Sequence, residues 1–429
     1  MRRIVKRQDR AVILVLVLWI LIVLAMIAYS LLFQVTTETT ITASRKKYLK
    51  AQALARAGVA KSIIDLRNDL LYDASDEQQR YFDAEGDVWA RIEEGKEEVV
   101  LGKDKERDGY FNAVVFDESG LININFIGGT NMVLLQKIME RIGYEEEDAK
   151  FVAGLIVDWR DGDTIPTLPN TPSNEEGRAY AVLINEDAGG ETDPTKVQPL
   201  RMRNESFLTV EELLEIPGVT AELFFGPGSP EAEYFAPQLI QVEGDRFQIK
   251  EKRRSRSDGP VLGLRDYITV NGPGSINMNT APEHVLAAFA EAAGETDGDR
   301  FAERVVRTRR GGKDHDIDNS SAFKTTTEVQ ANPELQSVLQ AGGGVMAFGV
   351  SSPTYRIISE GVVGNVRARM EVLVHRQLAP LQRVESFEYN DRAQEARERN
   401  SGRYERRENN KNELQVLYPY VRILQAYQD

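Results

Sequence analysis

The chain has 429 residues, a hydrophobic fraction of 41% and a charged fraction of 28%, which are values of an ordinary folded protein of two or three folding units. There is no cysteine, which excludes disulfides and thiolate chemistry, and the three histidines lie too far apart for a compact zinc motif. The formal net charge is −14, although residues 1–10 alone carry +4, so the remaining residues sum to −18. A strongly acidic body repels phosphate backbones and favours divalent cations, so nucleic acid is not an expected partner.

An uncharged, proline-free segment at residues 11–33 is the first recognisable element. Its 23 residues, at about 1.5 Å each in a helix, reach roughly 34 Å, enough to cross the hydrocarbon core of a bilayer. The basic residues before it predict a cytoplasmic amino terminus, so the rest of the chain is expected on the far side, which in a bacterium is the periplasm. A cleaved secretory signal is the alternative, but it would have a shorter apolar region and a small-residue cleavage site, and no such site follows Phe33.

The helical pattern continues beyond the membrane span. Apolar residues recur every three or four positions at Leu49, Ala53, Ala57, Ala60 and Ile64. We therefore predict one helix from the membrane to about Leu71, whose outer half carries a narrow apolar stripe with basic residues near it. The only weak point in this helix is Gly58.

Two pairs of strands are predicted, far apart in the chain. Residues 110–116 and 121–125 flank a turn and are typical of a hairpin, and residues 355–363 and 366–376 flank the turn pair Gly364-Asn365. We expect both hairpins to form one antiparallel sheet packed on the outer half of the long helix. The roughly 230 residues between them are then an insertion, and the fold class is α+β.

The insertion contains an internal repeat. The hexapeptide GLININ at residues 120–125 recurs as GSINMN at residues 274–279. Each copy precedes a segment with helical periodicity, and each is followed by a helical signal that opens with threonine, at Thr209 and at Thr325. The predicted helices after the two copies cover residues 131–142 and 282–293, and the two related helical units cover residues 126–225 and 274–345.

An acidic loop is the segment with the most chemical character. Asp158, Asp161 and Asp163 precede Pro166, with Gly162 between the last two carboxylates. Three carboxylates in such a loop can turn their oxygens toward one hard cation such as calcium. Because the spacing differs from that of an EF-hand, a solvated acidic turn is the alternative, and a metal-dependent hydrolase has less support. No spacing of nucleophile and base indicates an enzyme.

The tetrapeptide Ile216-Pro217-Gly218-Val219 is typical of the turn of a helix-hairpin-helix, which in nucleic-acid enzymes offers backbone amides to a phosphate. The DNA-binding form needs a second glycine two residues on, where this chain has Thr220, and four glutamates surround the turn. We therefore favour a helix-packing role. A membrane-anchored periplasmic DNA-binding protein of the uptake type is the alternative function.

Several of these motifs together resemble the protein K family of minor pseudopilins, which are type IV pilin-like subunits of bacterial type II secretion systems. The resemblance covers most of residues 11–376. It is carried by the basic leader, the apolar segment that begins at Ala11, the stretch AQALARAG at residues 51–58, FLTVEELLEIPGV at residues 207–219 and NTAPE at residues 279–283.

The resemblance implies a domain organisation: a leader at 1–11, a transmembrane helix at 12–33 and its periplasmic continuation at 34–71, a pseudopilin body at 72–125 and 351–378, and at 126–350 a large, mostly helical insertion of the SAM-like or helix-hairpin-helix kind. Residues 385–413 are expected to be a charged linker. Residues 414–429 have no counterpart in the family, and either docking back onto the body or contact with a partner is expected of them.

The resemblance also implies that the leader is cleaved and that the subunit has a particular place in the pilus-like stack. A prepilin peptidase would cut between Ala11 and Val12, although the family normally has glycine before the cut. The fifth mature residue is Leu16, whereas ordinary pilins have a glutamate there and protein K lacks it. A carboxylate in lipid requires a partner, taken to be the amino terminus of a neighbouring subunit. A subunit without this carboxylate lacks one bond to a subunit above it and belongs at the top of the stack.

The function implied is structural and not enzymatic. The subunit would cap the tip of the periplasmic pseudopilus and help to start its assembly for export across the outer membrane, as a single-pass inner-membrane protein. The implied partners are the minor pseudopilins I and J, the major pseudopilin, the inner-membrane assembly platform and prepilin peptidase. Calcium is implied as a ligand, with Asp158, Asp161 and Asp163 matching the family's acidic loop and Glu175 and Glu176 its later acidic pair.

Overall fold

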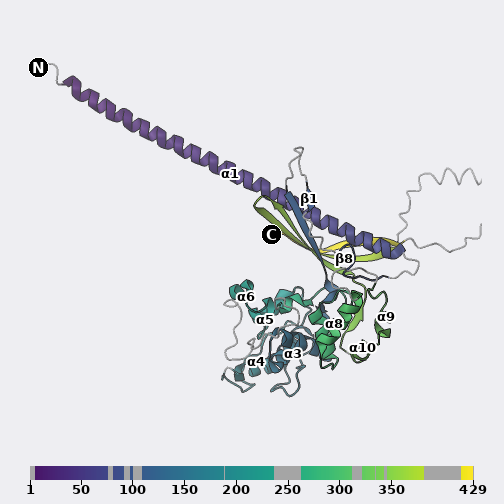
Figure 1. Cartoon of the computed structure of the whole chain (residues 1–429). Coiled ribbons are helices and arrows are strands. Elements are labelled where there is room, and N and C mark those ends of the chain that lie inside the picture. Colours follow the sequence, from purple (N-terminus) through teal and green to yellow (C-terminus); the bar gives the residue numbers. More distant parts are fainter. Residues whose placement is uncertain are drawn as a thin grey trace, which may run out of the picture.

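The computed structural model of the chain consists of a long helix, a small antiparallel sheet on the far half of that helix, and a helical insertion next to the sheet (Figure 1). The architecture is α+β, as predicted. The residues that the structure describes are 5–75, 81–90, 97–99, 109–187, 189–235, 262–311, 321–333, 335–342, 345–380 and 417–428. The charged linker predicted at 385–413 lies outside them.

Helix α1 runs without interruption from Val5 to Ser75, 71 residues in all. It confirms the prediction of one continuous helix and extends four residues beyond the predicted end at Leu71. Side chains 13–49 are exposed, and this half of the helix projects away from the rest of the molecule (Figure 1). The span that begins at Ile13 has the hydropathy and length of a membrane-crossing helix.

Small side chains bring the far half of α1 close to the sheet. Ala51, Ala55 and Gly58 are packed against it. A Cβ atom on Gly58 would lie 2.2 Å from the Ser359 hydroxyl oxygen, and one on Gly361 would lie 2.0 Å from the Ala51 carbonyl oxygen. The helix continues through Gly58, which is therefore a close-packing position of the helix against the sheet.

The sheet has five strands in the order β1-β2-β7-β8-β9, all antiparallel. Their bounds are Glu97–Val99, Gly109–Asp117, Thr354–Val363, Val366–Pro380 and Leu417–Gln428. The hairpin β7–β8 is confirmed, with Val363 paired to Val366 across the turn and Gly364 at a φ of 61°.

The first predicted hairpin is wrong in its second strand. Strand β2 forms as predicted but pairs with β7. The residues after it form a short 3₁₀ turn at Glu118–Gly120 and then β3 at Ile122–Asn123, which pairs in parallel with β4 at Ile268–Thr269. The turn therefore leads the chain out of the sheet and into the insertion.

The carboxy-terminal segment forms strand β9 at the edge of the five-stranded sheet. It pairs with β8 from Pro380↔Leu417 to Met370↔Gln428, with a register shift after Leu373. Of the two expectations for this segment, docking onto the body is the one that the structure shows.

The insertion has one large hydrophobic core. Its first part comprises η2 Ile124–Phe126, α2 Val133–Ile142, α3 Glu146–Arg160, α4 Glu176–Asp187, η3 Val210–Glu215, α5 Ala221–Phe225, α6 Pro230–Phe235 and η5 Leu264–Asp266. Its second part comprises β5 Ser275–Asn277, α7 Glu283–Ala292, α8 Gly298–Arg309, α9 Thr326–Ala331, α10 Gln336–Gly342 and β6 Ala347–Gly349. Helices α2 and α7 confirm the two predicted after the repeat.

The repeated hexapeptide performs the same task twice. The Asn125 side chain bonds to both the N–H and the C=O of Phe207, and Asn279 does the same with Phe323. Each unit also closes with a parallel strand pair, β3 with β4 and β5 with β6. The second asparagine of each copy thus ties the start of its unit to the segment before a threonine-capped helical turn.

Candidate functional site

Three of the predicted calcium ligands meet in the insertion. Asp158 lies in the last turn of α3, Asp161 is the residue that ends this helix, and Glu176 is the first residue of α4. One carboxylate oxygen from each lies within 4.8 Å of the other two. The loop between the two helices thus folds back and brings residues 15 or more positions apart into one acidic group, which we name the loop triad.

The loop triad has buried oxygens without a partner. Asp158 and Glu176 are buried, and one oxygen each of Asp161 and Glu176 is inaccessible to solvent and accepts no hydrogen bond. Asp158 is held in place by the Tyr180 hydroxyl at 2.8 Å and by the Thr167 amide at 2.9 Å. Unpartnered buried carboxylate oxygens are costly unless a cation binds them, so this donor set fits a hard divalent ion.

The raised pKa values of the loop triad also fit a cation site. Burial, and after it the charges of Asp158, Asp161 and Asp163, raises the pKa of Glu176 to about 8. Burial likewise raises the pKa values of Asp158 and Asp161. The only arginine within this part of α3, Arg160, turns away and donates to the carbonyl oxygens of Ile124 and Ile127.

The other two predicted ligands are not members of the loop triad. Asp163 is exposed and accepts a hydrogen bond from the Ile165 amide, although its charge still acts on the triad. Glu175 is exposed and forms an ion pair with Arg178 at 3.0 Å. Adjacent residues at the start of α4 face different sides, so only the second of the acidic pair reaches the loop.

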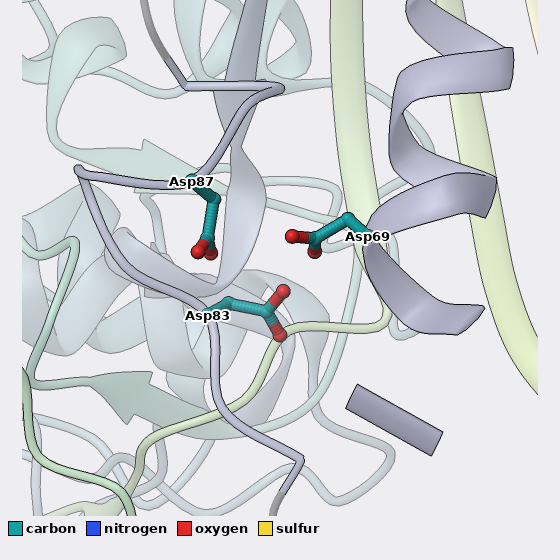
Figure 2. Close-up of side chains that lie close together, drawn as sticks. All are labelled: Asp69, Asp83 and Asp87. Atoms are coloured by element: carbon teal, nitrogen blue, oxygen red, sulfur yellow. The ribbon is translucent and has the colours of Figure 1, made fainter. Parts of the chain in front are cut away.

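A second acidic group, which is not among the sequence-based predictions, lies where α1 meets the sheet. Asp69 comes from α1, whereas Asp83 and Asp87 come from the segment 81–90, and the three point toward one another (Figure 2). This group, which we name the junction triad, contains its own cation. The Arg376 guanidinium forms ion pairs with Asp83 and, at 2.9 Å, with Asp69.

Arg376 is anchored from several sides. It donates to the Leu66 carbonyl oxygen and lies over the Tyr355 ring, while the Tyr355 hydroxyl donates to Asp83. A signal for this site was present in the sequence, because Arg376 alternates in phase with Met370, Val372 and Val374, whose side chains face the helix. A cation on the inward face of a strand requires buried anions.

The outer half of α1 carries a second apolar face. Leu49, Ala53, Ala60 and Ile64, which we name the outer stripe, are on the solvent side of the helix, with Leu49 at 57% exposure and Ile64 at 54%. Their spacings of four, seven and four residues keep them on one side of the helix. The residues packed against the sheet, such as Leu54, Gly58 and Leu66, occupy the opposite side. Ala57, the fifth residue of the predicted stripe, is half-buried at its edge.

The helix-hairpin-helix turn is part of the core of the insertion. Ile216, Pro217, Gly218 and Val219 are buried, and the Gly218 carbonyl accepts a hydrogen bond from the Tyr144 hydroxyl. The first helix of the motif is the 3₁₀ turn η3 and the second, α5, has five residues. Buried amides are out of reach of a phosphate, which favours the packing role over the DNA-binding one.

The predicted cleavage position lies within the first part of α1. Ala11 and Val12 both have helical backbone, one turn or more after Val5. The predicted position thus adjoins the apolar span that begins at Ile13.

The comparisons with known proteins differ in outcome. No family model matches the chain, and no curated protein matches it. Among solved structures, the chain is similar to one chain of the GspK-GspI-GspJ complex from the type 2 secretion system of enterotoxigenic Escherichia coli, with a TM-score of 0.48 and 12% identity, over 78% of this chain and 94% of that chain.

Proposed function

We propose that this chain is a minor pseudopilin of a type II secretion system, anchored in the inner membrane with its body in the periplasm, and that it caps the tip of the pseudopilus. The observation that carries the proposal is the two-faced stem. One side of the far half of α1 is covered by the chain's own sheet, and the other side presents the outer stripe to solvent.

An exposed apolar stripe on a helix that continues into a membrane span is suited to helix–helix packing with a neighbour that shares the membrane. Small residues at Ala53 and Ala60 permit close approach, and Leu49 and Ile64 supply the larger contact area. The proposed neighbours are the minor pseudopilins I and J, the major pseudopilin and the assembly platform. No catalysis is part of the role.

The tip position is supported by Leu16 and by the insertion. Leu16 is an apolar residue in the membrane span and offers no carboxylate to the amino terminus of a subunit above. The insertion extends the body by more than 200 residues beyond the small sheet. A subunit that lacks this carboxylate–amino-terminus bond, and whose insertion covers its upper end, would be the last subunit of the stack. Before assembly, prepilin peptidase would cut after Ala11, so that Val12 becomes the new amino terminus.

A calcium ion at the loop triad is the proposed cofactor. Asp158, Asp161 and Glu176 would hold it, with Asp163 contributing charge from the rim. The ion would supply positive charge where the fold gathers carboxylates and would fix the connection between α3 and α4. Its role is structural.

Site-specific photo-crosslinking in the native host tests the proposed function. A photoreactive residue at Ile64 in the full-length chain should form products with other pseudopilins, because this position lies on the outer stripe. The same residue at Glu205, exposed on the insertion, serves as the control and should give few such products. Equal yields at both positions, or none at Ile64, would contradict the proposal.

A further inference from the structure

The stem of α1 is basic in a chain that is otherwise acidic. Residues 39–64 contain six lysines and arginines and no acidic residue, whereas residues 65–429 sum to −23. Three of the six, Arg45, Lys46 and Lys47, are consecutive and exposed, and they precede Ala51, the first residue buried against the sheet. We name these three the collar. None of them forms an ion pair within the described part of the chain.

Lipid headgroups lie at the limit of the collar's reach. Its residues lie 12–14 positions beyond Phe33, which in a helix is about 18–21 Å past the end of the apolar span. The headgroup layer accounts for roughly 5–8 Å of this distance, and the screening length at physiological salt is about 8 Å. A tilt of about 20° shortens the distance by only about a tenth. Side chains extended toward the membrane shorten the remaining gap to roughly one screening length, so the bilayer surface is a weak partner for the collar and a protein partner at the collar's own height is the stronger one.

A partner must offer negative charge at this height. A second copy in the same membrane would bring its own collar to the same level, which is repulsive. The outer stripe begins at Leu49, two residues after the collar, so a helix packed along the stripe toward the membrane passes beside the collar at an interaxial distance of roughly 8–10 Å. Lysine and arginine side chains span that distance.

We infer that the collar is a docking surface for acidic side chains on the stem helix of a different subunit that is anchored in the same membrane. This inference rests on the proposed function, because it takes the outer stripe to be covered by a neighbouring stem. The inference adds a statement about the neighbouring stem: it carries aspartate or glutamate residues that face the collar. On that stem, these acidic residues lie one to two helical turns nearer the membrane than the residues that pack on the outer stripe. Charge pairing of this kind fixes the axial register and suppresses self-pairing.

The test uses the full-length chain in its native host, with the photoreactive residue at Ile64. The collar is reversed by the combined substitutions Arg45→Glu, Lys46→Glu and Lys47→Glu. The yield of products with other pseudopilins should fall about tenfold, because the attractive pairs of Arg45 and Lys46, which flank the outer stripe, become repulsive. The glutamine substitutions Arg45→Gln, Lys46→Gln and Lys47→Gln should give an intermediate yield and leave the amount of chain in the membrane unchanged.

A matched control reverses three exposed basic residues of the insertion, with Lys150→Glu, Arg201→Glu and Arg300→Glu, and should retain the wild-type yield within twofold. A collar variant that matches this control, while the unaltered collar still cross-links, would overturn the inference and leave the proposed function standing. Products that consist of two copies of this chain, or a collar effect that appears only in bilayers with anionic lipid, would also overturn it. Absence of any product from the unaltered collar would remove both proposals together.

Discussion

The two acidic triads of this protein solve the same electrostatic problem in opposite ways. In the junction triad, the buried carboxylates of Asp69 and Asp83 surround Arg376, which comes from a strand about 300 residues away in sequence. In the loop triad, Asp158, Asp161 and Glu176 come together without a cationic side chain, and two of their buried oxygens have no partner.

This difference teaches where an ion is needed. A triad with an internal guanidinium is a complete ion-pair network, and its members hold α1, the segment 81–90 and the sheet together. A triad without an ion-paired guanidinium is electrostatically incomplete. Burial raises the pKa values of carboxylates in both triads, those of Asp69, Asp158 and Glu176 among them, but the ion-paired Arg376 opposes this rise at Asp69 and no such ion pair opposes it in the loop triad. Both triads have three clustered carboxylates, so acidic residue count alone does not distinguish a metal site from a structural junction.

The largest expected effect comes from removal of the internal cation. Arg376→Met should lower the free energy of unfolding by about 3–5 kcal/mol, because it leaves two buried carboxylates unpaired. Thermal or denaturant unfolding of the detergent-solubilised chain measures it, followed by fluorescence in a background with Trp19→Phe and Trp159→Phe, in which Trp89 beside Tyr355 is the remaining tryptophan. Arg369→Met on the same strand is the control and should cost less than about 1 kcal/mol, because that side chain is 55% exposed. Equal effects would mean that the junction triad is not a buried network.

Calcium should separate the two triads. At a concentration 100 times its dissociation constant, calcium should add about 2.7 kcal/mol to the free energy of unfolding, and a chelator should remove this gain. Asp161→Asn in the loop triad should abolish the gain, whereas Asp87→Asn in the junction triad should leave it intact. Isothermal titration and melting curves provide the measurement. An unchanged melting temperature with calcium would refute the proposed site.

The metal-free protein should respond to amide substitutions with opposite signs. Glu176 must take up a proton when the metal-free chain folds near neutral pH, because its pKa is raised to about 8. A glutamine is neutral in both states, so Glu176→Gln should raise the free energy of unfolding without calcium by about 1 kcal/mol or more. Asp83→Asn removes a charge that Arg376 requires and should lower it. Melting temperatures of both variants in excess chelator test these opposite signs. If Glu176→Gln lowers the melting temperature under those conditions, the loop triad is already neutralised.

The last expected effect is a dependence on pH. Since the pKa of Glu176 is raised from 4.5 to about 8, the folded metal-free chain holds a proton that the unfolded chain releases. Stability without calcium should therefore decline as pH rises from about 4.5 to about 8. Calcium displaces this proton, so its binding should release protons below pH 8 and flatten the decline. Glu176→Gln should remove this contribution to the slope, and the same slope in that variant would assign it to another group.

Much of the fold could be predicted from local patterns. The continuous helix, the β7–β8 hairpin, and helices α2 and α7 all follow from apolar periodicity and turn residues, which depend on neighbours within a few positions. The strand at 121–125 was assigned to the wrong sheet, because its alternation is equally consistent with pairing to β2 or to β4. The backbone turn at Glu118–Gly120 decides between them.

The site was predicted in part for a similar reason. Asp158 and Asp161 share one short segment, so their spacing carries information about a common centre. Whether Glu175 or Glu176 reaches that centre depends on the rotation of α4, which tertiary packing sets. The junction triad draws on a helix, a loop and a strand, and no spacing in the sequence connects them.

The amino-acid sequence alone determined the long helix with its apolar first half, the basic residues and the apolar stripe of its outer half, and the presence of acidic groups, because helix period, charge and hydropathy are local properties. Only the tertiary structure decided which side of the stem the sheet covers and which acidic group receives an arginine. Those outcomes require contacts between residues as far apart as Asp69 and Arg376, and the packing of the whole core selects such contacts.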